Sequence, residues 1–142
     1  MAEVTTPVHA APEMTIGKIW FSFEGRISRS TWWMKYFLPV MGITIGLSIL
    51  DMILGTTWTI APADPYTGMP EQSMGILSLI WGLVGIWIFF AAGAKRIHDR
   101  NRSGWFQLIW FIPVVNLWVW IETWFLRGTV GPNRFGPDPV TE

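Results

Sequence analysis

The sequence predicts an all-α integral membrane protein with a short interfacial amphipathic helix, three transmembrane helices and an irregular C-terminal tail rich in glycine and proline. Apolar residues make up 51% of the 142 positions and charged residues only 14%, well below the quarter that is usual in soluble domains. Three apolar segments are separated by short loops, and the basic residues gather in two basic regions. The length allows one domain, which we place at residues 16–139, between a disordered tail at 1–15 and a short end at 140–142.

The composition excludes several kinds of chemistry. The chain has no cysteine and two histidines, His9 and His98, so disulfides, thiol chemistry and a histidine-rich zinc site are excluded. We therefore predict no metal and no cofactor. The opening residues lack a basic start followed by an apolar core, so they do not predict a secretory signal peptide.

Residues 16–23 predict a short helix that lies in the membrane interface. Ile16, Ile19, Trp20 and Phe23 recur at helical spacing and form one apolar stripe. The same stripe would also suit an extension of the protein core, and both interpretations stay open on the sequence alone.

The first transmembrane helix is predicted at about residues 32–54. Its fully apolar part, residues 36–50, would extend about 22 Å, which is short of a full crossing. The helix becomes long enough if Trp32 and Trp33 lie at the interface and Lys35 extends its amine to the headgroups.

Four residues within this first helix have a predicted structural or functional role. Pro39 is expected to kink the helix, and Asp51 to lie near the far interface. Gly42 and Gly46 form a small-xxx-small pattern that allows two helices to approach closely. We therefore predict helix association through these glycines.

The second transmembrane helix, at about residues 73–94, is the clearest prediction from the sequence. Residues 72–94 carry no formal charge and would extend about 34 Å as a helix, which exceeds the roughly 30 Å of a hydrocarbon core. A buried helix of a soluble protein is rarely apolar on every face over this length.

The third apolar segment, residues 105–126, contains Pro113, Asn116 and Glu122. We favour one kinked crossing, because proline is tolerated in membrane helices where neighbours satisfy the freed carbonyl. The alternative is a re-entrant hairpin with its tip at residues 112–116. Asn116 is expected to form an interhelical hydrogen bond, and Glu122 to pair with Arg127 or to act as an intramembrane relay.

The distribution of basic residues predicts the orientation. Loop 55–72 contains no lysine or arginine, so we expect it outside, with the N-terminus and the 95–104 loop cytoplasmic. A single crossing at 105–126 would put the C-terminus outside, whereas a re-entrant hairpin would return it to the cytoplasm. The basic residues that carry this bias are Lys18, Arg26, Arg29, Lys35, Lys95, Arg96, Arg100 and Arg102.

The stretch "AKRIHDRNRSGW" at residues 94–105 is interpreted as a cytoplasmic anchor. Anionic headgroups would stabilise it by about 1 kcal/mol per basic residue. A catalytic pair of His98 and Asp99 is disfavoured, because consecutive helical residues point about 100° apart. Ser103 is expected to cap the third segment. The candidates for binding lipid or a partner are Arg26, Arg29, Lys95, Arg96, His98, Asp99, Arg100 and Arg102.

The C-terminal stretch "RGTVGPNRFGPDP" cannot form a regular helix or strand. Asn133 and Gly136 suit tight turns, and Arg134 and Asp138 could pair with opposite charges elsewhere. We therefore expect an ordered tail that docks on the rest of the protein.

Three motifs in order, "FEGRISRSTWW", "KRIHDRNRSGWFQLIWFIPVV" and "GTVGPNRFGPDP", resemble the domain of unknown function 805 family over about residues 16–139. The resemblance implies a multi-pass helical protein of the bacterial inner membrane and brings no catalytic residue or cofactor. If the three motifs meet on one surface, the re-entrant interpretation gains support. The positions that match the family motifs are Gly25, Arg26, Arg29, Arg96, His98, Asp99, Ser103, Gly104, Trp105, Asn133, Arg134, Gly136 and Asp138.

Three functional hypotheses follow. The first is a non-enzymatic membrane protein whose basic cytoplasmic face binds anionic lipid, a membrane-protein partner or a second copy of the chain, with no role for nucleic acid. The second is a component of a transporter or ion pathway that uses Glu122, Asn116 or Asp51. The third is an enzyme acting on lipid headgroups through His98 and Asp99.

Overall fold

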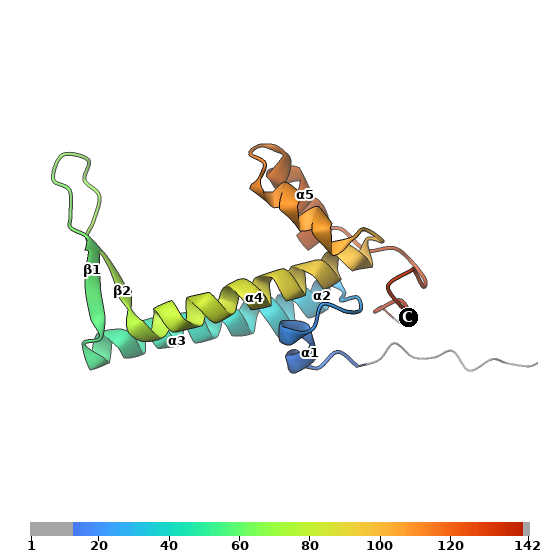
Figure 1. Cartoon of the computed structure of the whole chain (residues 1–142), viewed down its shortest axis with the longest axis horizontal. Coiled ribbons are helices and arrows are strands. Elements are labelled where there is room, and N and C mark those ends of the chain that lie inside the picture. The colour runs from blue at the N-terminus through green and yellow to red at the C-terminus, as the bar shows by residue number, and fades with distance from the viewer. Residues whose placement is uncertain (1–12, 141–142) are drawn as a thin grey trace, which may run out of the picture.

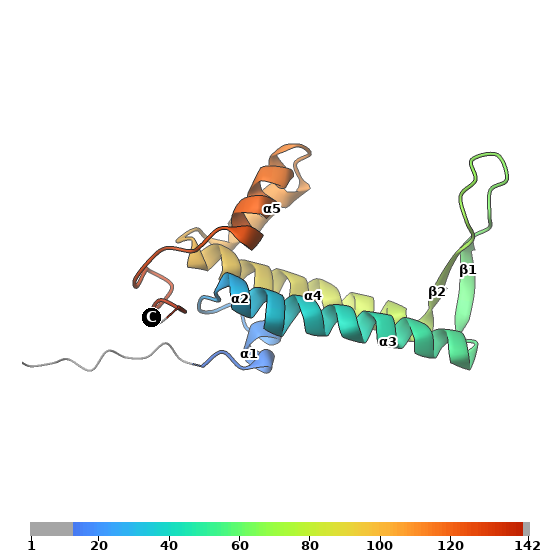
Figure 2. The same ribbon diagram turned by 180° about the vertical axis from the view of Figure 1, so that it is seen from behind.

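The computed structural model describes residues 13–140, so most of the predicted disordered tail lies outside the described residues. Two long apolar helices lie side by side, a β-hairpin extends from one end of the pair, and the remaining elements gather at the other end (Figures 1 and 2). In chain order the elements are α1 (Ile16–Phe21), α2 (Arg29–Thr31), the π-helical turn η1 (Trp32–Phe37), α3 (Leu38–Leu54), β1 (Thr57–Ala61), β2 (Gln72–Gly75), α4 (Ile76–Asp99), the 3₁₀-helix η2 (Gly104–Phe111) and α5 (Val115–Phe125).

The elements α2, η1 and α3 form one continuous helix from Arg29 to Leu54. The sequence predicts a kink at Pro39; the structure has a widened π-helical turn just before it, in which the N–H of Leu38 donates to the carbonyl of Trp33. Pro39 has no N–H to donate to the carbonyl of Lys35, four residues earlier. The indole of Trp20 donates to that carbonyl instead, at 3.1 Å, and so links α1 to the first long helix.

The helices Arg29–Leu54 and Ile76–Asp99 are both long and apolar enough to cross a membrane. At about 1.5 Å per residue, the twenty-four residues of α4 extend about 36 Å. Large apolar side chains on both helices face outward, with Ile53 72% exposed and Leu83 63% exposed. The central helix of a soluble protein would bury such residues, whereas a lipid-facing helix exposes them.

The connection between the two long helices corrects the all-α prediction, because it contains an antiparallel β-hairpin. Thr57 pairs with Gly75 and Trp58 with Met74, and an irregularity follows Thr59. The alternating sequence "TWTIA" is typical of a strand, but the prolines nearby favoured an irregular loop. The chain is therefore mostly helical rather than all-α.

Asp51 lies in the last turn of α3, at the end where the sequence predicts the far interface. It is fully buried, and its carboxylate accepts the N–H groups of Leu77 at 3.0 Å and Ser78 at 2.8 Å. The hydroxyls of Thr56 and Ser78 donate to it as well. Asp51 on α3 therefore caps the N-terminus of α4, where orphan N–H groups favour negative charge. Gly75 leaves room for it, since a Cβ there would sit 2.0 Å from Asp51 Oδ2.

The third apolar segment is not the single kinked helix that we favoured. It folds into η2 and α5, and the turn between them contains Pro113 and Val114, whose φ is 71°. The two ends meet, because Arg102 bonds to Glu122. This hairpin, defined here as residues 104–126, projects away from the α3–α4 pair (Figure 1). Its geometry is that of the re-entrant alternative.

The hairpin is fixed to α4 by close packing. A Cβ on Gly93 would sit 2.7 Å from both Gln107 Nε2 and Trp110 Cη2, so only glycine permits this approach. The amide of Gln107 donates to the carbonyl of Phe90 at 2.9 Å. Trp110 then packs in a small buried cluster with Ile97 and Val119.

The main buried cluster lies where α1 meets the two long helices, and its buried members are Ile19, Ile27, Trp32, Tyr36, Ile88 and Ala92. Ile19 anchors α1 in this cluster, while Ile16 and Phe21 on the same short helix are about half exposed. The buried face of α1 thus fits the interpretation as an extension of the core. Its exposed apolar face is the one that the interfacial interpretation requires.

Gly42 and Gly46 have no neighbouring atoms within 4 Å of an added Cβ, so they mediate no helix contact within the described chain. Association with a second chain through these glycines stays a prediction.

Replacing Asp51 with alanine is expected to lower the free energy of unfolding by about 2 kcal/mol, because the N–H groups of Leu77 and Ser78 lose their acceptor. Thermal unfolding of the protein in detergent, followed by circular dichroism, measures the change. Asp64→Ala is the matched control, since Asp64 accepts only local bonds at the tip of the β-hairpin. Equal melting temperatures for the two variants would contradict the capping role.

Candidate functional site

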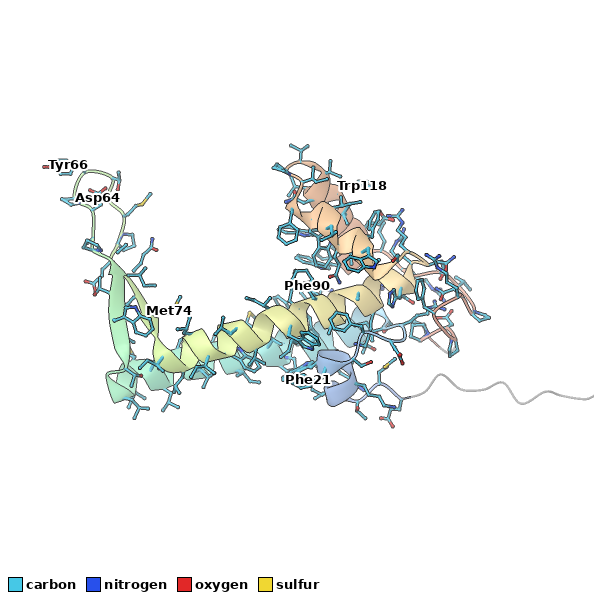
Figure 3. All side chains as sticks on the ribbon, in the orientation of Figure 1. Phe21, Asp64, Tyr66, Met74, Phe90 and Trp118 are labelled. Atoms are coloured by element: carbon cyan, nitrogen blue, oxygen red, sulfur yellow. The ribbon has the colours of Figure 1, made fainter. Side chains whose placement is uncertain are left out.

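Three segments that are far apart in the sequence meet at the end of the α3–α4 pair opposite the β-hairpin. They are residues 24–29, 95–104 and 127–138, and we call them together the charged end. Asp64 and Tyr66 mark the tip of the β-hairpin at the other extremity of the molecule (Figure 3). The three family-like motifs therefore meet at one end of the molecule. This is the arrangement that supports the re-entrant interpretation of residues 105–126.

Arg26 is the residue that holds the three segments together. Its side chain is only 1% exposed, and its Nε and Nη2 donate to Asp99 Oδ1 at 3.1 and 3.0 Å. The same guanidinium donates to carbonyl oxygens of the tail: Nη1 to Gly131 at 2.8 Å and Gly136 at 3.1 Å, and Nη2 to Thr129 at 2.7 Å. A planar group with five N–H donors suits this arrangement, which a lysine could not reproduce.

Arg96 binds the other oxygen of the same carboxylate. Its Nη1 lies 2.5 Å from Asp99 Oδ2, and its Nη2 donates to the carbonyl of Leu126, at the end of the hairpin. A Cβ on Gly128 would sit 1.8 Å from Asp99 Oδ2, so the tail backbone passes directly over the carboxylate. Asp99 is thus enclosed by two arginines and glycine backbone.

A second group of ion pairs closes the base of the hairpin. Glu122 accepts from Arg100 at 2.8 Å and from Arg102 at 3.1 Å, and its side chain is only 6% exposed. The sequence predicts that Glu122 pairs with Arg127 or acts as a relay. Two arginines from the 95–104 loop hold the carboxylate instead, and Arg100 also donates to the carbonyl of Arg127 at 2.6 Å.

Lys95 turns inward, whereas an anchor would extend its amine outward to the headgroups. It is fully buried, and its amine donates to the carbonyls of Ile19 at 3.1 Å and Ala91 at 3.3 Å. Ile19 O lies in the last turns of α1, where carbonyls lack helical partners. Lys95 therefore fastens α1 to α4.

The tail is docked, as its composition predicted. Asn133 donates to the carbonyl of His98 at 2.9 Å, and Arg134 donates to that of Asn101 at 3.2 Å. Asp138 accepts the N–H of Gly131 at 2.7 Å. Partial burial opposes ionisation of Asp138, yet N–H bonds from Val140 and Gly131 and the charge of Arg26 hold its pKa below the usual value. Gly136 adopts a φ of 136°, which favours glycine at this turn.

His98 is fixed by two contacts and neither involves Asp99. Its ring stacks on Phe135 with centroids 3.9 Å apart, and Nδ1 lies 3.2 Å from the carbonyl of Gly25. Because a carbonyl only accepts, Nδ1 must carry the proton in this contact. The structure does not assemble a His98–Asp99 pair, since Asp99 is bound by Arg26 and Arg96.

The matched positions 103–105 lie where η2 approaches α4. A Cβ on Gly104 would sit 3.2 Å from the Cβ of Ala94, so glycine permits this approach. Ser103 precedes η2, but its hydroxyl makes no capping bond, contrary to our expectation. Trp105 is 80% exposed, and Asn116 lies near the hairpin tip with no side-chain hydrogen bond among the described residues.

Reasoning from the sequence missed several residues of the charged end. Thr129 donates through its hydroxyl to the carbonyl of Asp99, and Phe135 stacks on His98. Gly93 and Gln107 join η2 to α4. Thr129, Phe135, Gly93 and Gln107 belong to no recognisable local motif, although Phe135 lies next to the matched residues Arg134 and Gly136.

The ion pairs do not neutralise the charged end. Arginines outnumber the carboxylates that they contact, and Arg29 and Arg134 are exposed at its surface. The side chain of Arg102 is 42% exposed although it contacts Glu122. The β-hairpin region at the opposite extremity contains Asp64 and Glu71 but no basic residue. The molecule therefore has one basic end and one acidic end.

An apolar helix pair with a charged end held together by buried ion pairs defines the class: a small, mostly helical membrane protein. The family model described as "Protein of unknown function (DUF805)" matches residues 20–137. The chain therefore belongs to the DUF805 family.

Curated relatives agree with this assignment. The chain is 34% identical to inner membrane protein YhaH of Escherichia coli K12 over 125 residues, which cover 88% of this chain and 93% of the relative. It is 28% identical to inner membrane protein YhaI of the same strain over 127 residues, covering 89% and 92%. No solved structure matches the chain.

Replacing Arg26 with lysine is expected to destabilise the protein by about 3 kcal/mol, because the buried charge remains but its paired hydrogen bonds to Asp99 and the tail are lost. Limited proteolysis should then cleave the chain after residue 126 faster than in the wild type. Arg29→Lys is the control, since Arg29 is exposed and its side chain makes one hydrogen bond within residues 13–140, to the carbonyl of Phe125. Unchanged cleavage in Arg26→Lys would mean that Arg26 does not hold the tail.

Proposed function

We propose that this chain is a non-enzymatic inner-membrane protein whose charged end faces the cytoplasm and binds the headgroups of anionic lipids. In this proposal α3 and α4 cross the membrane, the hairpin at 104–126 enters the cytoplasmic leaflet without crossing, and both termini are cytoplasmic. The β-hairpin lies on the outer side.

The observation that carries the topology is the set of bonds from Arg26 to the tail. Residues on opposite sides of a membrane cannot form direct hydrogen bonds, so these bonds support placing residues 26, 99 and 129–136 on one side. In that arrangement an even number of crossings separates residue 99 from residue 129. The hairpin geometry of residues 104–126 supports zero crossings in that interval.

The orientation follows from charge. Loops rich in lysine and arginine stay in the cytoplasm, and the charged end holds the arginines while residues 55–72 hold none. Exposed arginines next to the membrane attract anionic headgroups by about 1 kcal/mol each. Arg29 and Arg134 are the exposed members that we expect to contribute most.

The geometry favours neither of the other two hypotheses. Glu122 is bound by two arginines, and Asp51 is fully occupied as a helix cap, so neither carboxylate is placed as a step in an ion path. His98 and Asp99 have separate partners, so an acid–base pair for headgroup chemistry is not assembled. Binding without turnover is the function that the geometry supports best.

A reporter that is active only in the cytoplasm is expected to be active when fused after Glu142, because the tail is bonded to Arg26. The same reporter inserted at Gly68, in the loop of the β-hairpin, should be inactive. An inactive C-terminal fusion of a stable, membrane-inserted protein would overturn the two-crossing topology.

The double variant Arg29→Gln/Arg134→Gln is expected to retain several-fold less anionic phospholipid through purification, in line with about 1 kcal/mol per basic residue. Mass spectrometry of the lipids that accompany the detergent-extracted protein gives the measurement. Asp64→Asn/Glu71→Gln is the control, since it also removes two charges but at the opposite extremity of the molecule (Figure 3). Equal anionic lipid in all three proteins would contradict the headgroup proposal.

A further inference from the structure

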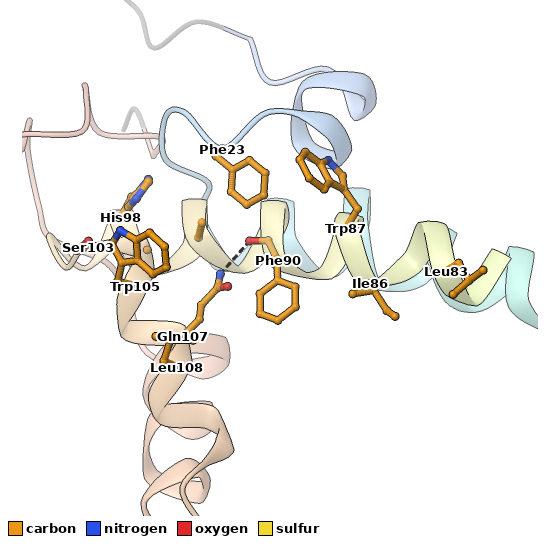
Figure 4. Close-up of a pocket in the computed structure, with 12 residues that line it drawn as sticks. Phe23, Leu83, Ile86, Trp87, Phe90, His98, Ser103, Trp105, Gln107 and Leu108 are labelled. Atoms are coloured by element: carbon orange, nitrogen blue, oxygen red, sulfur yellow. Dashed lines mark hydrogen bonds between the residues drawn. The ribbon is translucent and has the colours of Figure 1, made fainter. Parts of the chain in front are cut away.

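An apolar groove runs along α4 beside the charged end, and the ion pairs do not account for it. It has a volume of about 660 Å³ and opens between α4, the loop at Phe23 and the start of η2 (Figure 4). Leu83, Ile86, Trp87 and Phe90 line its long part, and His98, Ser103 and Gly104 line its end. Pockets of this size hold ligands with a large apolar body and a few oriented polar groups.

The length of the apolar lining matches one leaflet. Leu83 and Ala94 are eleven residues apart on α4, or about 16 Å, and half of a hydrocarbon core is about 15 Å. Ala94 lies at the charged end and Leu83 lies toward the middle of the helix. An acyl chain of the cytoplasmic leaflet would run parallel to this wall over its whole depth.

The polar end of the groove is fixed and has unused hydrogen-bonding capacity. With Nδ1 of His98 donating to Gly25, Nε2 is left as an acceptor, and no described residue bonds to it. The hydroxyl of Ser103 likewise has no partner among residues 13–140. A Cβ on Gly104 would sit 3.4 Å from His98 Nε2, so glycine keeps the space beside this nitrogen open.

Charge narrows the choice of headgroup. The guanidinium of Arg134 lies 4.7 Å from the ring of Phe135, which in turn stacks on His98. This positive surrounding disfavours an ammonium head and favours a phosphate, which would accept from Ser103. A hydroxyl on the head would donate to His98 Nε2. Anionic phospholipids with a hydroxylated head, such as phosphatidylglycerol, combine these groups.

We propose that the groove binds one acyl chain of an anionic, hydroxyl-bearing phospholipid, with its phosphate at Ser103 and its head hydroxyl at His98 Nε2. The inference rests on the proposed lipid-binding function and adds a specific site and lipid class to it. It differs from surface attraction because it requires an open apolar groove as well as charge.

The test adds phosphatidylglycerol to delipidated protein in detergent and counts bound lipid by native mass spectrometry. We expect one retained lipid per chain in the wild type. Ile86→Trp fills the groove and should weaken binding about tenfold, equivalent to roughly two CH₂ groups displaced from an apolar contact. Ile80→Trp is the matched control, because Ile80 and Ile86 are both 56% exposed on α4 and Ile80 does not line the groove. Equal binding by the two variants overturns the groove.

The headgroup assignment is tested with Arg134→Gln and with phosphatidylethanolamine as the competing lipid. The wild type should prefer phosphatidylglycerol, and Arg134→Gln, which removes the positive charge that disfavours an ammonium head, should lose most of this preference while keeping a bound chain. Ser103→Ala should weaken the binding of both lipids equally, because both carry the phosphate. Wild-type protein that binds the two lipids equally overturns the assignment of the head.

The two lipid proposals fail separately. If Arg29→Gln/Arg134→Gln loses lipid while Ile86→Trp keeps it, surface attraction stands and the groove falls. If only Ile86→Trp loses lipid, the groove stands and the surface proposal falls. If Ile86→Trp converts a dimer to a monomer, the groove holds a second copy of the chain and the lipid inference is overturned.

Discussion

The carboxylate of Asp99 lies between two arginines, Arg26 and Arg96, and all three side chains are almost completely buried. Taking these charges out of water costs several kcal/mol each, and the cost is offset only if every charge keeps good partners. The guanidinium of Arg26 achieves this by donating to backbone carbonyls of the tail as well as to Asp99. The tail, the N-terminal loop and the end of α4 consequently depend on one another. Removing any of them would leave a buried charge without its partners.

This dependence explains how a chain with few buried apolar side chains holds its segments in one relative arrangement. Its two buried clusters both lie near the charged end, while the outward faces of α3 and α4 remain exposed. In lipid, apolar side chains gain little from packing on one another, so polar contacts carry more of the specificity. Two polar contacts define the ends of α4. Asp51 caps its N-terminus, and Arg96 and Asp99 fix its C-terminus.

The hairpin at 104–126 shows how the same logic acts on an apolar segment. Its sequence is apolar enough for a crossing, but Glu122 near its end is bound by Arg100 and Arg102 near its start. Satisfying that carboxylate brings the two ends together, and the turn at Pro113 and Val114 allows it. Pairing with these two arginines therefore outweighs hydropathy in deciding the path of this segment.

The sequence by itself determined the features that depend on local composition. Hydropathy located the two long helices, and glycine and proline indicated an irregular tail that would dock. The tertiary structure decided which groups the buried charged side chains bond to. Arg26 meets Asp99 across 73 positions and Gly131 across 105, and Asp51 meets Ser78 across 27. The β-hairpin and the folding back of residues 104–126 were likewise decided by the tertiary structure. Hydropathy and helical periodicity report only on neighbours within a few turns, whereas a buried charge is satisfied by whichever distant donor the fold brings within about 3 Å.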